Sequence, residues 1–194
     1  MKPVICMITD RHRAGGEDAL LRRVAAAARA GVHLVQVRER DLEGGPLARL
    51  VGRCLEAVRA TGARVVVNDR LDVALAAGAH GVHLRADSMP AHRARALAPP
   101  GFLIGRSVHS LEDVARATAG GGLDYVMFGP VWPTSSKPGH PGAGVQTLAE
   151  VAAATAVPVL AIGGITPETS VEAMCAGAAG FAAISLFDTP ADVP

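Results

Sequence analysis

The sequence predicts an α/β fold of the (β/α)₈ TIM-barrel class, with residues 1–194 forming a single domain. Two observations support this prediction. Eight short apolar runs occur along the chain, and stretches rich in Ala, Leu and Arg with helical spacing lie between them. The runs are almost continuously apolar instead of alternating, which is typical of parallel strands covered on both faces. Because such barrels usually have about 250 residues, a chain of 194 residues would be a compact example with short loops.

The predicted strands are the eight apolar runs, at residues 4–8, 34–37, 65–67, 81–84, 102–104, 125–128, 157–162 and 181–184. The clearest helical stretches are residues 20–30, 47–60, 111–119 and 148–154. Gly31, Gly78 and Gly177 stand where helices would end, because glycine readily takes the left-handed conformation of a helix C-cap. Thr166 and Ser110 are suited to begin helices, since their hydroxyls can cap the first turn.

The predicted strand at 181–184 is followed only by residues 185–194. A complete eighth helix does not fit there, so we expect it to be short or missing. Two explanations stay open: the chain is truncated, or another subunit of a homodimer covers the gap.

The composition indicates an ordered globular protein, with 49% apolar and 19% charged residues. A net charge of +1 and 3% aromatic residues argue against a nucleic-acid partner. No apolar run is long enough to span a membrane, and the start of the chain lacks the layout of a signal peptide. Cys6, Cys54 and Cys175 are far apart and lie in apolar stretches, so we expect buried free thiols and a cytoplasmic location.

Residues 125–139 begin as a predicted strand and then turn into Gly, Pro, Thr, Ser and Lys. A buried strand that opens into such a loop is typical of a site on a rigid scaffold. Thr134, Ser136 and Lys137 offer hydroxyls and a cation, which are suited to holding phosphate oxygens. The alternative is an ordinary surface loop with a solvated Lys137.

Polar residues follow nearly every predicted strand. The carboxyl ends of barrel strands meet at one rim, where ligands bind. Convergence of polar groups at that rim favours a small-molecule site over a purely structural barrel. The residues concerned are Thr9, Asp10, Gln36, Arg38, Glu39, Arg40, Asn68, Asp69, Arg70, His83, Arg85, Arg106, Ser107, His109 and Ser185.

The turns after the seventh and eighth strands contain Gly163, Gly164, Ile184 and Ser185. In this architecture the same corner usually holds phosphate through backbone N–H groups. We therefore predict a phosphate site there. The alternative is two tight turns that require glycine.

Asn68-Asp69-Arg70 places an amide, a carboxylate and a guanidinium together. Asp69 can bind Mg²⁺ through oxygen, and Arg70 can contact phosphate. In the alternative interpretation, Asp69 caps the following helix and Arg70 pairs with Asp72 or another surface acid.

Gln36 and Arg38 share one face of a buried strand, which favours an inward polar cluster over a strand-end group of salt bridges. His109 is the histidine best placed for proton transfer, although a role in orienting a loop by hydrogen bonds is the stronger interpretation. His33 and His80 precede strands, at the opposite end, and are expected to be structural.

Six motifs spread over essentially the whole chain resemble the superfamily of thiamine phosphate synthases and TenI-like thiazole tautomerases. They are residues 8–10, 35–39, 68–70, 81–84, 129–138 and 161–165. The resemblance implies a transferase that joins hydroxymethylpyrimidine diphosphate to thiazole phosphate, giving thiamine phosphate and diphosphate. It also implies Mg²⁺, which neutralises the leaving diphosphate, and a dissociative reaction in which the thiazole nitrogen captures a pyrimidine carbocation.

The resemblance also implies roles by position. Gln36 would face the pyrimidine, and Asp69 would be a Mg²⁺ ligand. Ser107 would assist near the diphosphate. The diphosphate would be held by Arg38, Arg40, Asn68 and Lys137. The thiazole or its phosphate would be seated by Thr134, Ser136, Gly164 and Ser185.

Three positions depart from the synthase pattern. Arg40 stands where the synthases usually have Lys, which keeps the charge but loses the compact ammonium. Ser88 replaces the second Mg²⁺ carboxylate, and Asp87 is the candidate substitute. Residues 38–40 and 105–110 are more similar to the tautomerases, yet Pro130 stands where those enzymes have a catalytic His.

These departures leave alternatives beside the synthase. One is a thiazole phosphate tautomerase that recruits His109 or another base. Another is a non-catalytic binding protein for thiamine phosphates. A barrel with some other phosphorylated substrate also remains, because barrels host many chemistries.

Overall fold

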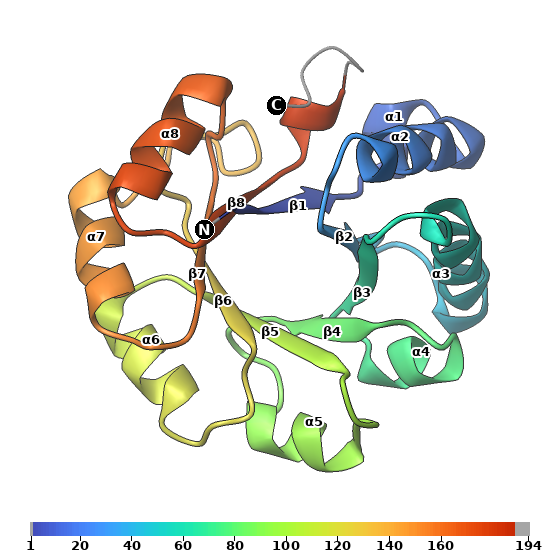
Figure 1. The fold of residues 1–194 in the computed structure, drawn as a ribbon, viewed down its shortest axis with the longest axis horizontal. Coiled ribbons are helices and arrows are strands. Elements are labelled where there is room, and N and C mark those ends of the chain that lie inside the picture. The colour runs from blue at the N-terminus through green and yellow to red at the C-terminus, as the bar shows by residue number, and fades with distance from the viewer. Residues whose placement is uncertain (1, 189–194) are drawn as a thin grey trace.

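The computed structural model describes residues 2–188, and its eight parallel strands close into one barrel in chain order (Figure 1). The strand that closes the barrel is β8, which pairs with β1 so that Val4 lies opposite Gly180. The predicted fold and all eight apolar runs are confirmed. The strands are β1 Val4–Ile8, β2 Leu34–Val37, β3 Arg64–Asn68, β4 Gly81–Leu84, β5 Leu103–Val108, β6 Tyr125–Phe128, β7 Val159–Ile162 and β8 Gly180–Ala183.

The helices form a ring outside the barrel (Figure 1). Thr166 caps its helix as predicted, in a capping box with Thr169, and the Ser110 side chain accepts a hydrogen bond from the Asp113 N–H. Gly31, Gly78 and Gly177 all have positive φ after a helix, as the C-cap prediction requires. The helices are α1 Arg11–Ala14, α2 Glu17–Arg29, α3 Gly44–Val58, α4 Leu71–Ala76, α5 Ala91–Leu97, α6 Leu111–Thr118, α7 Val145–Ala153 and α8 Pro167–Cys175.

After β8, the described chain contains only a 3₁₀ turn, η1 Ser185–Phe187. Leu186 and Phe187 are buried, and Asp188 forms ion pairs with Arg13 at 2.5 Å and Arg23 at 2.9 Å. This turn therefore anchors the end of β8 to the α1–α2 segment. A helix beyond it would lie outside the described residues.

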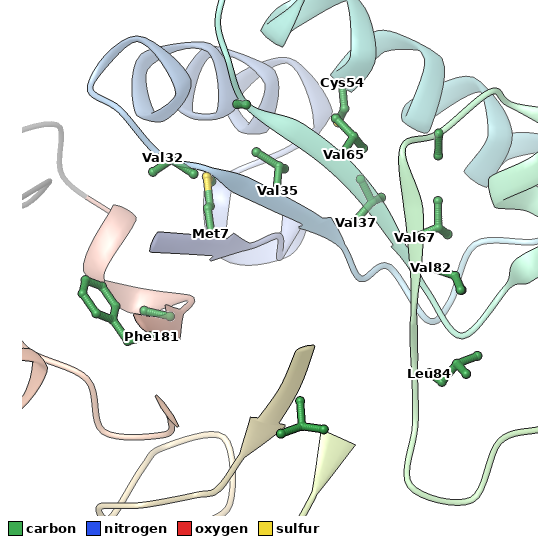
Figure 2. Packing of buried hydrophobic residues seen from close by; sticks show 14 of the residues in the cluster. Met7, Val32, Val35, Val37, Cys54, Val65, Val67, Val82, Leu84 and Phe181 are labelled. Atoms are coloured by element: carbon green, nitrogen blue, oxygen red, sulfur yellow. The ribbon is translucent and has the colours of Figure 1, made fainter. Parts of the chain in front are cut away.

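Alternation of side chains along each strand produces two apolar layers. One lies between strands and helices: Figure 2 shows Val35 and Val65 in this layer, with Cys54 of α3 near Val65. The other fills the barrel interior, where Cys6 and Tyr125 belong to a separate buried cluster. Small residues make room inside, because a Cβ on Gly105 would lie 2.1 Å from the Tyr125 ring. Apolar side chains thus fill the barrel interior below the rim, and polar side chains lie above this apolar layer.

Cys6 and Cys54 are buried free thiols, as predicted, whereas Cys175 is exposed and the prediction for it is wrong. Cys175 lies two positions after the buried Ala173, a rotation of about 200° around α8 that turns it to solvent. Among the described residues, no helix combines the length and apolar character needed to cross a bilayer.

Candidate functional site

A cavity of about 480 Å³ opens at the carboxyl ends of the strands, and all eight strands or the loops after them contribute to its walls. Catalytic, substrate-binding or metal-binding roles were predicted for 15 residues, and 14 of them line this cavity. The roles themselves stay predictions. The 14 residues are Gln36, Arg38, Arg40, Asn68, Asp87, Ser107, His109, Thr134, Ser136, Lys137, Gly163, Gly164, Ile184 and Ser185.

Gln36 lies on the inner wall of the barrel and is almost completely buried. Its Nε2 donates a hydrogen bond to Asn68 Oδ1 at 3.0 Å. Its Oε1 is buried without a hydrogen-bond partner among the described residues. Because an unsatisfied buried acceptor costs free energy, a ligand that donates a hydrogen bond in the cavity would bind favourably there.

His83 lines the same cavity as Gln36 and is almost completely buried, although the sequence placed it only at the rim and gave it no role. Its Nε2 is 2.9 Å from Ser107 Oγ, and its Nδ1 is 3.2 Å from the Tyr125 hydroxyl. Burial, helped by the nearby cations Arg106 and Arg38, lowers the pKa of His83 to about 3. The ring is therefore neutral near pH 7 and has one donor and one acceptor nitrogen, which orient Ser107. Its place in the 81–84 motif was the signal that could have identified it.

Three cations on the walls form no salt bridge within residues 2–188: Arg38, Arg40 and Lys137. Burial, followed by repulsion from Arg40, lowers the pKa of Arg38. Glu39 points elsewhere, since it accepts hydrogen bonds from Thr9 Oγ1 at 2.6 Å and from the Arg11 backbone. The alternative of a salt-bridge group within residues 38–40 is thus not formed, since Glu39 pairs with Arg11 at 3.2 Å. Arg38 instead adds charge to the cavity wall, as the predicted inward polar cluster requires.

The loop after β6 packs against the loop after β7. The Val131 N–H donates to Ile162 O at 2.9 Å, and Trp132 N–H to Gly163 O at 3.2 Å. A Cβ on Gly164 would lie 2.6 Å from Trp132 Cβ, and φ at Gly164 is 69°. Glycine is therefore required by this tight contact. The turn interpretation is thus confirmed for the turn after β7 only, since the turn after β8 contains no glycine. A phosphate role for both turns remains a prediction.

Asp69 is the predicted metal ligand that is absent from the cavity wall. Its φ of 62° places it in the left-handed region. Its carboxylate accepts a hydrogen bond from the Ser88 hydroxyl and lies 3.6 Å from the Arg85 guanidinium. The same guanidinium contacts Asp87 at 2.5 Å. One cation thus links both predicted metal ligands.

Arg70 pairs with Asp72 at 2.7 Å and lies outside the cavity wall. The prediction that Arg70 contacts a ligand therefore gives way to the surface-pair alternative. The same alternative also held that Asp69 caps the following helix, and this is wrong. The N-cap of α4 is Arg70, and no side chain forms a cap hydrogen bond there. Asp69 is held by the loop after β4 instead.

Arg106 anchors the loop after β4, residues 85–89. Its buried guanidinium donates to the backbone carbonyl groups of Arg85 at 3.2 Å, Ser88 at 2.7 Å and Met89 at 3.0 Å. Burial lowers the pKa of Arg106, although Asp69 and Asp87 oppose this. Sequence reasoning did not assign this role, because the carbonyl partners are 17–21 residues away along the chain.

His109 takes the position expected for a histidine that orients a loop. Its Nδ1 is 2.6 Å from Gly129 O, which makes Nδ1 the donor and leaves Nε2 as the acceptor. His33 and His80 each accept a backbone N–H through Nδ1 at the entrance of a strand, so both structural predictions are confirmed.

A divalent cation would find oxygen ligands in the Asp69–Asp87 region. Among residues 2–188, no group of three or more His, Cys, Asp or Glu side chains gathers around one point. The two carboxylates nevertheless surround a common cation, the Arg85 guanidinium, and the Ser88 hydroxyl adjoins them. Mg²⁺ commonly takes one or two carboxylates and completes its shell with water and substrate phosphates. The oxygen groups present fit that requirement.

Comparison with known proteins assigns this architecture to a family. The chain matches the thiamine monophosphate synthase family over residues 5–187. It belongs to this family. Three similar proteins bear names that agree with it.

The putative thiamine-phosphate synthase of Geobacter sulfurreducens is 48% identical over 181 residues, covering 92% of this chain and 84% of the relative. The thiamine-phosphate synthase of Methanoculleus marisnigri is 45% identical over 174 residues, covering 89% and 81%. The solved thiamine phosphate pyrophosphorylase of Pyrococcus furiosus has a TM-score of 0.84 at 32% identity, covering 98% of this chain and 89% of that one. The family predicted from the motifs is confirmed.

Proposed function

We propose that this thiamine monophosphate synthase family member is a transferase that joins hydroxymethylpyrimidine diphosphate to thiazole phosphate, giving thiamine phosphate and diphosphate. The observation that supports this best is the cavity itself. It combines the buried Oε1 of Gln36, which has no partner among the described residues, with Arg38, Arg40 and Lys137, which form no salt bridge within residues 2–188. A heterocycle with an amino group and an attached diphosphate matches both features. Relatives of this name at 39–48% identity support the same function.

The pyrimidine would lie at the base of the cavity. Gln36 Oε1 would accept a hydrogen bond from its amino group, while Asn68 holds Gln36 in place through the 3.0 Å bond. Ile8 and Met127 line the same cavity and would pack against the ring. The neutral His83 would orient Ser107 toward the reacting side of the substrate.

The diphosphate would lie against Arg38, Arg40 and Lys137. Bond breaking in a dissociative reaction moves negative charge onto this leaving group. Fixed cations in a partly dry cavity stabilise that charge without reorganising. No protein nucleophile is required, since the cavity holds both substrates close together. The thiazole phosphate would occupy the remaining wall, formed by Thr134, Ser136, Gly163, Gly164, Ile184 and Ser185.

Magnesium is part of this proposal, with Asp69 and Asp87 as its protein ligands. Bound Mg²⁺ would supply charge that neutralises the leaving diphosphate. The chain's own residues would orient the diphosphate and position these carboxylates. A cytoplasmic location also belongs to the proposal, since the free thiols of Cys6 and Cys54 suit a reducing compartment.

The direct test incubates the purified protein with both phosphorylated substrates and Mg²⁺ and measures thiamine phosphate by chromatography. We expect product that depends on both substrates. Absence of product at every Mg²⁺ concentration would contradict the synthase proposal. Tight binding of thiamine phosphate without turnover would then select the binding protein. Exchange of the thiazole ring proton with solvent, in the absence of pyrimidine, would select the tautomerase.

A further inference from the structure

Arg85 occupies an unusual position among the residues after β4. Its side chain is half-exposed and lines the same cavity as Gln36 and Lys137. It also contacts the two acids proposed to hold Mg²⁺, with N–O separations of 3.6 Å to Asp69 and 2.5 Å to Asp87. A guanidinium therefore lies where both carboxylates would meet a metal ion.

The loop around Arg85 is held on several sides. Ser88 Oγ accepts the Arg85 backbone N–H at 3.0 Å and donates to Asp69. Arg106 binds three carbonyl groups of the loop from below. The backbone of residues 85–89 is thus fixed, whereas the Arg85 side chain ends in ion pairs with partly exposed acids. Such pairs are individually weak and exchange readily.

Charge makes this arrangement incompatible with a tightly bound metal. Mg²⁺ between Asp69 and Asp87 would face the Arg85 guanidinium at short range, and like charges at such distances repel. A diphosphate bound in the cavity would reduce this repulsion between Mg²⁺ and Arg85. It offers a bidentate partner for a guanidinium and additional oxygen ligands for Mg²⁺.

We propose that Arg85 is exchanged between two partners: the acids Asp69 and Asp87 in the free protein, and the diphosphate in the substrate complex. The guanidinium competes with divalent metal while the cavity lacks diphosphate. When diphosphate enters, Arg85 turns to it and releases both carboxylates for the metal. Metal and diphosphate then bind with positive coupling. This inference rests on the proposed function for its choice of metal and diphosphate.

The test measures Mn²⁺ binding by electron paramagnetic resonance, with and without inorganic diphosphate, and requires no turnover. In the wild-type protein we expect weak Mn²⁺ binding that tightens when diphosphate is added. Arg85→Gln removes the competing charge and keeps a polar side chain. We expect it to bind Mn²⁺ about tenfold more tightly without diphosphate and to lose most of the coupling. Arg85→Lys, which keeps the charge, should restore weak binding.

Arg93→Gln is the matched control, because Arg93 is an exposed arginine of α5 outside the cavity wall. It should leave Mn²⁺ binding and coupling unchanged. The proposal is overturned if Arg85→Gln binds free Mn²⁺ no more tightly than wild type, or if its coupling with diphosphate is undiminished. Either result stands whether or not the wild-type protein forms thiamine phosphate, so failure of this inference is separate from failure of the proposed function.

Discussion

Gln36 is a side chain whose hydrogen bonding leaves one buried acceptor available to a ligand. Its buried Oε1 lacks a partner among the described residues, while its Nε2 is held by Asn68. A free protein bears the cost of that unmade hydrogen bond, and a ligand with a donor removes it. Functional side chains are commonly the ones that a folded protein leaves incompletely bonded.

Replacing Gln36 should therefore weaken catalysis far more than folding. For Gln36→Leu we expect kcat/KM for the pyrimidine diphosphate to fall by about 10- to 100-fold, as a lost buried hydrogen bond implies. Urea denaturation should show a smaller change in the free energy of unfolding, because removing the unpaired buried Oε1 offsets loss of the Nε2 bond to Asn68. Steady-state kinetics of purified variants check this, and an unchanged kcat/KM would refute the role.

His83 should make the protein sensitive to acid. Its pKa is about 3 in the folded state and near 6.5 when exposed, so between these values the unfolded chain binds a proton that the folded protein does not. Stability is then fully present above pH 6.5 and falls as the pH drops through this window, by at most about 1.4 kcal/mol per pH unit. Denaturation of wild type and His83→Gln across the window measures it. The variant should show a shallower loss; equal slopes would contradict the prediction.

At the scale of elements, the loop after β4 depends on a residue of β5. Arg106 donates to three backbone carbonyl groups of residues 85–89. The loop bears Arg85 and Asp87, and its Ser88 binds Asp69. The position of the proposed metal ligands is thus set by a neighbouring strand more than by the loop's own sequence.

Arg106→Met should loosen this loop. It removes the hydrogen bonds of a charged donor to three part-buried backbone carbonyl groups, which costs about 1–3 kcal/mol of the free energy of unfolding. Hydrogen exchange of the amides in residues 85–89 should accelerate, and Mn²⁺ binding with diphosphate should weaken. Arg116→Met provides the control, since Arg116 is an exposed residue of α6. Unchanged exchange in the loop would show that Arg106 does not anchor it.

Across the whole molecule, charge is distributed unevenly. The net formal charge is only +1, yet Arg38, Arg40 and Lys137 all line the one cavity at the barrel rim. Opposite charges elsewhere form surface pairs, such as Arg53 with Glu17. The barrel thereby gathers cations from two separate segments, the loops after β2 and β6, into one cationic wall.

The affinity of an anion for that wall should depend on the salt concentration. We expect inorganic diphosphate, measured calorimetrically without metal, to bind about tenfold more weakly as salt rises from about 0.05 to about 0.5 M. Arg38→Gln should weaken binding at low salt and flatten this dependence. Arg59→Gln removes an exposed charge that pairs with Glu56 at the end of α3 and should change neither. Salt-independent binding by the wild type would contradict the prediction.

The barrel could be predicted because its causes are local. Apolar runs such as 125–128, and helix ends such as Gly31, have their effect within a few residues, and the carboxyl ends of parallel strands necessarily share one rim. For that reason Gln36, Asn68 and Lys137 could be expected to meet. The exposed Cys175 is the local error, since helix phase was not considered there.

Most partners of the charged groups could not be read from the chain, although Asp72 was an alternative partner for Arg70. Arg85 lies between Asp69 and Asp87, and Arg106 binds carbonyl groups up to 21 residues away. Several acids and bases compete for each partner, with similar small energies. The choice among them depends on loop conformation and burial, which arise when distant segments pack. Local hydrophobic pattern is sufficient to specify the scaffold, whereas the pairing of its polar groups requires the folded chain.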